Sequence, residues 1–225
     1  MTLFGEGFIA IWSNIREEGL ETFYAWHDNE HVAERVGIPG FLRGRRYVAV
    51  DATVRFFMCY ETVSPEVQVG TDYLNRLNAP TEWTRAALPH FFDTTRSLTR
   101  KIFSQAKGDG AELVAAGIDA PGGALVELRR RLLTGLLPEL YLEPGIAGVH
   151  WCETNRTAST IETAEKKGRT VGVCDAVVLI ESSRPGPARA ARARLVEALA
   201  GVPGVTTPVA PGHFRLEFEK VKLVV

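Results

Sequence analysis

Residues 38–41 read Ile-Pro-Gly-Phe, and residues 143–146 read Glu-Pro-Gly-Ile. Each Pro-Gly pair follows a stretch with helical spacing and precedes one rich in β-formers, as expected for a turn between a helix and a strand. A second pair of landmarks lies further along, with Tyr-Glu-Thr at 60–62 and Ile-Glu-Ser at 180–182. The shared order predicts that one structural unit occurs twice in the chain.

The first copy has the pattern β-α-β-β-α-β, which is that of a ferredoxin-like unit. Alternating apolar residues indicate strands, and apolar residues spaced three or four apart indicate helices. The second helix is interrupted at Pro80. The expected elements are a strand at 7–15, a helix at 17–36, hairpin strands at 43–50 and 54–63, a helical stretch at 71–88 and a strand at 95–106.

The second copy repeats this order after a glycine-rich junction at 107–123. The boundary predicts one ferredoxin-like unit over 1–106 and a second over 107–225. The expected elements of the second copy are a strand at 112–119, a helix at 124–140, hairpin strands at 146–155 and 174–183, a helix at 187–200 and a strand at 213–223.

A sheet with helices on only one face leaves its other apolar face uncovered. A second copy in the same chain can cover that face. We therefore expect an α+β fold in which two tandem ferredoxin-like units form a pseudo-dimeric barrel, with the sheets packed face to face. Each half would hold a cleft between its sheet and its helices.

Composition narrows the class of protein. The chain has 225 residues, of which 45% are hydrophobic and 24% charged, as in ordinary globular proteins. A net charge of -1 favours small-molecule partners over nucleic acid or an anionic membrane. Three cysteines without a CxxC pair suggest neither a disulfide framework nor a thiolate zinc site. The amino-terminal apolar run is short and lacks a basic leader, so we expect a cytoplasmic protein.

The most distinctive motif is Trp-His-Asp-Asn-Glu-His at 26–31, followed by the Pro-Gly turn and the arginine-rich strand that reaches Tyr47. With these residues the chain resembles the dimeric α+β barrel superfamily, and in particular its EthD-like branch. The resemblance implies a protein that acts on small molecules. Members of the superfamily include polyketide cyclases, lactone isomerases, quinone-forming or haem-degrading monooxygenases, and accessory proteins. His31 matches the motif histidine most directly.

His27 and His31 are four residues apart on the expected helix, so they share one face, with Phe23 and Tyr24 on neighbouring positions. A histidine in an apolar cleft can accept or donate a proton near neutral pH. We expect His31 and His27 to be catalytic and the two aromatic residues to bind substrate. Alternatively, one histidine is partly exposed and the other bonds a backbone carbonyl or Glu30.

The same two histidines raise the question of a metal. The spacing in His-Asp-Asn-Glu-His differs from HExxH, and a third ligand would have to come from His90 or Glu61. Haem is the other cofactor considered, because some members of the superfamily bind it through a histidine. Without a haem signature in the sequence, we expect neither a metal nor a cofactor.

Arg43, Arg45 and Tyr47 alternate along the second strand and therefore point to one face. An arginine there could bind a carboxylate or phenolate of the substrate, and Tyr47 could donate to the same oxygen. We expect Arg45 and Tyr47 to stabilise an oxyanion and Arg43 to bind substrate. Ordinary ion pairs at the helix–sheet edge are the alternative.

Residues 71–92 form a longer and more aromatic stretch than the matching region of the second copy. They could form a lid over the first cleft, lined by Trp83, His90, Phe91 and Phe92. The alternative is a second helix broken at Pro80, with its aromatic residues in the core. The second copy has no counterpart of the two histidines, since its helix reads Glu-Leu-Arg-Arg-Arg-Leu-Leu-Thr-Gly-Leu-Leu at 127–137. The first copy is therefore the candidate active half and the second a supporting half.

These patterns favour an enzyme of the cyclase, isomerase, dehydratase or lyase type. It would act by histidine-mediated proton transfer on a small aromatic or enolisable substrate. One alternative is a cofactor-independent or haem-dependent monooxygenase of the same superfamily, and another is a non-catalytic binding or accessory protein. The pseudo-dimeric chain could also pair as a homodimer.

Overall fold

The computed structural model describes residues 3–222 and shows two copies of one βαββαβ unit. The strand β1 (Gly7–Ile15) and the strand β5 (Glu112–Asp119) begin and end where the sequence predicts. The predicted strand at 213–223 extends to Leu223, which lies outside the described residues. The other strands are β2 (Phe41–Asp51), β3 (Phe56–Thr62), β4 (Phe91–Ala106), β6 (Ile146–Thr154), β7 (Val171–Gly172), β8 (Ala176–Ser182) and β9 (Thr206–Val221).

The strand order is the same in both halves. It runs β4-β1-β3-β2 in the first half and β9-β5-β8-β6 in the second. All of these neighbours are antiparallel. This order confirms the predicted α+β fold of two tandem ferredoxin-like units.

The halves join through their edge strands. Strand β2 pairs with β9, and β4 pairs with β6. Because β1 also pairs with β4, eight strands close into a barrel without free edges. The two sheets therefore face each other across a common interior, and hydrogen bonds along both seams hold them together.

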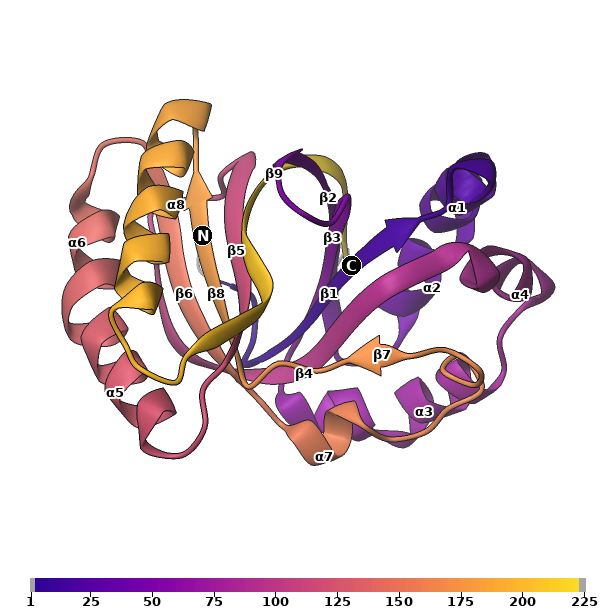
Figure 1. The fold of residues 1–225 in the computed structure, drawn as a ribbon. Helices are drawn as coiled ribbons and strands as arrows, with labels where there is room; N and C mark the ends of the chain where they lie inside the picture. The colour runs from indigo at the N-terminus through magenta and orange to yellow at the C-terminus, as the bar shows by residue number, and fades with distance from the viewer. Residues whose placement is uncertain (1–2, 223–225) are drawn as a thin grey trace.

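The helices lie outside the barrel in two groups (Figure 1). Those of the first half and those of the second cover opposite sides, except that α7 (Arg156–Ser159) of the second half lies on the first-half side (Figure 1). The longer helices predicted at 17–36 and 71–88 are each divided, the latter around Pro80. The helices are α1 (Leu20–Trp26), α2 (Val32–Gly37), α3 (Thr71–Asn78), α4 (Glu82–Ala87), α5 (Gly123–Arg131), α6 (Leu137–Leu142), α7 (Arg156–Ser159) and α8 (Pro185–Ala200).

A π-helical turn lies at the same place in both halves. His27–His31 joins α1 to α2, and Leu132–Leu136 joins α5 to α6. Both helices then end in a Pro-Gly turn, where Gly40 has φ +85° and Gly145 has φ +93°. Left-handed backbone of this kind favours glycine, which explains the landmarks in the sequence.

The barrel interior combines an apolar core with a buried ionic cluster. Aromatic side chains from both halves meet there, including Trp12, Phe57 and Phe214. Glu61 and Glu181 occupy equivalent strand positions, and both accept hydrogen bonds from the guanidinium of Arg45. The interior is thus filled by side chains.

Within residues 3–222, no helix is both long and apolar enough to cross a bilayer.

Candidate functional site

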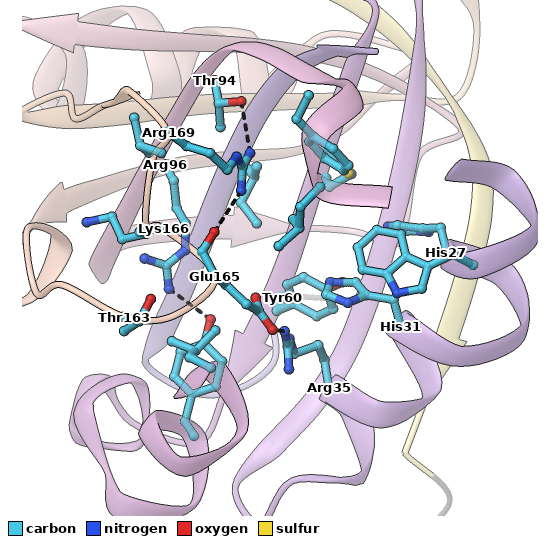
Figure 2. A pocket seen from close by; sticks show the side chains of 18 residues that line it. His27, His31, Arg35, Tyr60, Thr94, Arg96, Thr163, Glu165, Lys166 and Arg169 are labelled. Atoms are coloured by element: carbon cyan, nitrogen blue, oxygen red, sulfur yellow. Dashed lines mark hydrogen bonds and ion pairs between the residues drawn. The ribbon is translucent and has the colours of Figure 1, made fainter. Parts of the chain in front are cut away.

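A cavity of about 80 Å³ lies in the first half, between the outer face of the sheet and the helices. Figure 2 shows the histidines of the π-helical turn on one side of it. Strand β3 contributes Met58 and Tyr60, whose side chains point toward the helices. The apolar part of the wall consists of Ile11, Trp26, Met58, Leu77, Leu88, Phe91 and Val171.

The second half covers this cavity. Its hairpin strands β6 and β8 are connected by residues 155–175, whereas the equivalent connection in the first half spans only 52–55. This covering segment, residues 155–175, extends across the first half, where β7 pairs with the start of β4. Its residues Thr163, Glu165, Lys166, Arg169 and Val171 line the cavity. Both halves therefore build the site.

An ion pair attaches the covering segment to the first half. The carboxylate of Glu165 contacts the guanidinium of Arg35, which lies on α2 and is 2% exposed. Although burial opposes the charge of Arg35, Glu165 raises its pKa. Two further bonds join the segments, because Glu165 N donates to the carbonyl of Leu77 (3.2 Å) and Ala164 N donates to Oδ1 of Asn78 (3.0 Å).

His27 is buried and its tautomer is fixed by Arg46. The Nη1 atom of Arg46 lies 3.0 Å from Nδ1 of His27. Since a guanidinium only donates, Nδ1 accepts and the proton of the neutral ring is on Nε2. Burial first, and then the charge of Arg46, hold the pKa of His27 well below its usual value. His27 therefore presents an N–H donor at the cavity wall.

His31 presents a ring nitrogen, Nδ1, that has no hydrogen-bond partner among residues 3–222. Its ring stacks on Trp26 with the centroids 4.0 Å apart, and Trp26 is held in turn by a hydrogen bond from Nε1 to Thr84 Oγ1 (3.1 Å). The ring centroids of His27 and His31 are 5.6 Å apart. Burial, Arg35 and His27 lower the pKa of His31 well below its usual value, so the imidazole is neutral at pH 7 and can accept a proton.

Four buried polar atoms of the cavity residues have no hydrogen-bond partner in the part of the chain that the structure describes. They are Nε2 of His27, Nδ1 of His31, Oη of Tyr60 and Oγ1 of Thr163. Buried polar groups are normally paired, and a catalytic role or a bound water or ion is among the explanations for an exception. Burial raises the pKa of Tyr60 far above its usual value, so this phenol stays protonated and can donate.

The structure brings His27 and His31 together but separates them from Arg43, Arg45 and Tyr47. These three side chains point into the barrel, on the opposite face of the sheet. Arg43 and Arg45 both donate to Glu61 there, at 2.8 and 3.0 Å. The expected oxyanion pair of Arg45 and Tyr47, with Arg43 as a substrate ligand, therefore does not share a site with His31. Strand alternation places the intervening residues, including Arg46, on the helix side.

Four further candidates lie outside the cavity lining. Phe23 is fully buried behind the histidines, in contact with the ring of Phe56. Tyr24 donates to Glu217 (3.1 Å) at the surface. Trp83 is 37% exposed on α4, and His90 packs against Gly19. Of the four residues expected to line a lid, Phe91 lies in the cavity wall, whereas Trp83, His90 and Phe92 do not. The segment that covers the cavity, residues 155–175, comes from the second half.

Several lining residues escaped prediction from the sequence. Tyr60 lies on β3, for which no face was singled out from the sequence, and Arg35 follows His31 by one helical turn on the same face. The residues of the covering segment belong to a connection without a motif. Its length, compared with the short turn in the first half, is the signal that could have revealed it.

The equivalent space in the second half is filled. Leu132 and Leu136 stand where the first half has His27 and His31, and Leu140 stands where it has Arg35. These leucines pack with Leu128 and Leu195 in one aliphatic cluster. The second half thus lacks the polar groups of the first cavity.

The cavity residues suit neither a metal ion nor haem. Among residues 3–222, no three His, Cys, Asp or Glu side chains are grouped so that they could hold a metal ion. The alternative ligands His90 and Glu61 lie apart from the histidines, against Gly19 and inside the barrel. A cavity of about 80 Å³ is well below the roughly 300–1,000 Å³ of pockets that take cofactor-sized ligands, so haem does not fit it.

Comparison with known proteins supports the fold. No protein-family model and no curated protein sequence matches the chain. Solved structures do: an anthrone oxidase-like protein has a TM-score of 0.59 at 9% identity, covering 96% of this chain and 92% of that one. A candidate monooxygenase from Fusobacterium nucleatum has a TM-score of 0.58 at 7% identity, covering 97% and 96%.

A chlorite dismutase from Candidatus Nitrospira defluvii is similar over most of its length as well. The TM-score is 0.51 at 9% identity, and the match covers 94% of this chain and 91% of that chain. At such low identities the similarity shows a shared fold, the dimeric α+β barrel. None of these structures confirms the EthD-like branch.

Proposed function

We propose that this protein is a monooxygenase that acts, without a bound cofactor, on a small aromatic substrate with an acidic hydrogen. The observation that carries the proposal is the neutral His31 with its unpartnered Nδ1 beside the N–H of His27. The solved structures described as an anthrone oxidase-like protein and a candidate monooxygenase favour oxygen chemistry over the lyase or isomerase reading.

Proton transfer would be the first step. Nδ1 of His31 removes the acidic hydrogen, and the hydrogen bonds from His27 Nε2 and Tyr60 Oη stabilise the oxyanion that forms. The pKa of His31 is low as long as no anion lies beside its ring. A substrate anion beside the ring favours the charged imidazolium, so the proton transfer itself creates the partner that stabilises it.

Oxygen then reacts with the electron-rich anion. In overall balance, a CH₂ group and O₂ give a C=O group and H₂O. One oxygen atom enters the substrate, the other leaves in water, and the substrate supplies all the electrons. The reaction therefore needs no external reductant.

The cyclase, isomerase, dehydratase and lyase reactions share the proton transfer but consume no oxygen. A binding or accessory protein would catalyse neither step. A measurement of oxygen uptake therefore distinguishes a monooxygenase from these two alternatives.

The test measures oxygen consumption with the single-ring phenols resorcinol and phloroglucinol, and uses isotopically labelled oxygen to follow the product. We expect uptake with at least one compound and one labelled oxygen atom in its product. His31→Gln should lower the rate about 10²- to 10⁴-fold, the usual contribution of a general base. His90→Gln, outside the cavity, is the matched control. Conversion of a substrate without oxygen uptake would support the lyase or isomerase hypothesis instead.

A further inference from the structure

Three cations line the wall of the cavity opposite His31 (Figure 2). They are Arg96 on β4 and, from the covering segment, Lys166 and Arg169. Arg96 donates to the phenol of Tyr73 (2.8 Å), and Lys166 donates to the carbonyls of Ser159 (2.9 Å) and Ile161 (3.2 Å).

Arg169 is also bonded only to neutral groups. It donates to the carbonyl of Glu165 (3.3 Å) and to Thr94 Oγ1 (3.4 Å). Within residues 3–222, none of the three cations forms an ion pair with a carboxylate, although all three are half-buried.

This lack of carboxylate partners is unusual for the molecule. The fully buried arginines Arg35, Arg43, Arg45 and Arg46 each contact at least one carboxylate. The one acidic residue in the cavity lining is Glu165, whose carboxylate contacts Arg35. The wall formed by Arg96, Lys166 and Arg169 therefore carries positive charge that Glu162 and Glu165 offset only in part, since neither carboxylate forms an ion pair with these three cations.

The electrostatics agree with this geometry. Burial and the charge of Arg96 both lower the pKa of Lys166. The pKa of Arg169 is also lowered, first by burial, while Glu165 opposes the shift and Arg96 adds to it. A bound anion would favour the charged form of both groups. An ammonium has three donors, so two carbonyl contacts leave Lys166 one donor for such a ligand.

We propose that Arg96, Lys166 and Arg169 form a subsite for the carboxylate of an aromatic substrate. This inference rests on the proposed function, because it places the acidic hydrogen of the same molecule at His31. The apolar wall between the two ends would hold the ring. Thr163, whose Oγ1 has no partner, comes from the same segment as Lys166 and adds a neutral donor.

Binding of salicylate and of its uncharged analogue salicylamide tests the subsite. Both are single-ring phenols that suit a small cavity, and calorimetry gives both dissociation constants. We expect salicylate to bind at least about tenfold more tightly, as hydrogen bonds to charged groups usually allow. Lys166→Met should weaken salicylate about tenfold and leave salicylamide unchanged. Lys167→Met is the matched control, since Lys167 is the exposed next residue.

Equal affinity for the two compounds, no saturable binding of either, or equal effects of Lys166→Met and Lys167→Met would overturn the subsite. These results leave the oxygen assay on His31→Gln unaffected, so the proposed function can survive them. Conversely, salicylate binding that depends on Lys166, together with no His31-dependent turnover, would support the subsite and refute the proposed function.

Discussion

Acid should destabilise this protein through His27 and His31. Both pKa values lie well below 6.5 in the folded state, whereas the unfolded chain restores the ordinary value of about 6.5. The unfolded state therefore binds more protons as the pH falls below that value, and stability is lost. At about pH 5.5, one pH unit lower, each histidine costs up to roughly 1 to 1.5 kcal/mol, the limit for a group that stays neutral in the folded state, so both together cost at most about 3 kcal/mol.

Urea denaturation at about pH 7.5 and 5.5 measures this loss. Other titrating groups also contribute, so the comparison is between variants. Over the same interval His31→Gln should lose less stability than the wild type, by up to roughly 1 kcal/mol, because glutamine does not titrate. His90→Gln, which changes a histidine outside the cavity, is the matched control. Equal losses in the wild type and His31→Gln would show that His31 accepts a proton freely in the folded protein, contrary to the expected low pKa.

Three other changes test separate parts of the structure. Glu165→Gln should lower the free energy of unfolding by about 2 kcal/mol. This is less than the usual loss for a broken buried ion pair, because Arg35 keeps its contact with a second carboxylate, that of Glu34. The same variant should be cleaved faster by proteases within residues 161–172. Arg46→Gln should raise the pKa of His27, which an NMR titration would detect. Gly40→Ala should lower the free energy of unfolding by about 1–2 kcal/mol in urea denaturation, because its φ is +85°, with salicylate binding unchanged.

Local patterns in the sequence predict the repeated unit well. Alternation defines β1 and β5 to the residue, and the Pro-Gly turns at Gly40 and Gly145 align the two halves. These features depend on neighbours in the chain, which a single sequence contains. The position of His27 and His31 on one helical face follows for the same reason.

The rest of the site depends on contacts between distant segments. Alternation shows that Arg45 and Arg46 point to opposite faces, but not which face lies toward the helices. That choice is made by the closed barrel, where Arg45 meets Glu181 from the other half. The contact of Glu165 with Arg35 joins residues from different halves and has no signature in either segment.

The role of His31 as a base is tested by exchange of carbon-bound hydrogen for deuterium under anaerobic conditions, because this experiment isolates the proton transfer from oxygen chemistry. NMR would follow resorcinol and phloroglucinol in D₂O with the wild type, His31→Gln and His90→Gln. The wild type and His90→Gln should accelerate exchange of at least one compound, and His31→Gln should not. Equal acceleration by all three proteins, or none by the wild type, would contradict a role for His31 as the base.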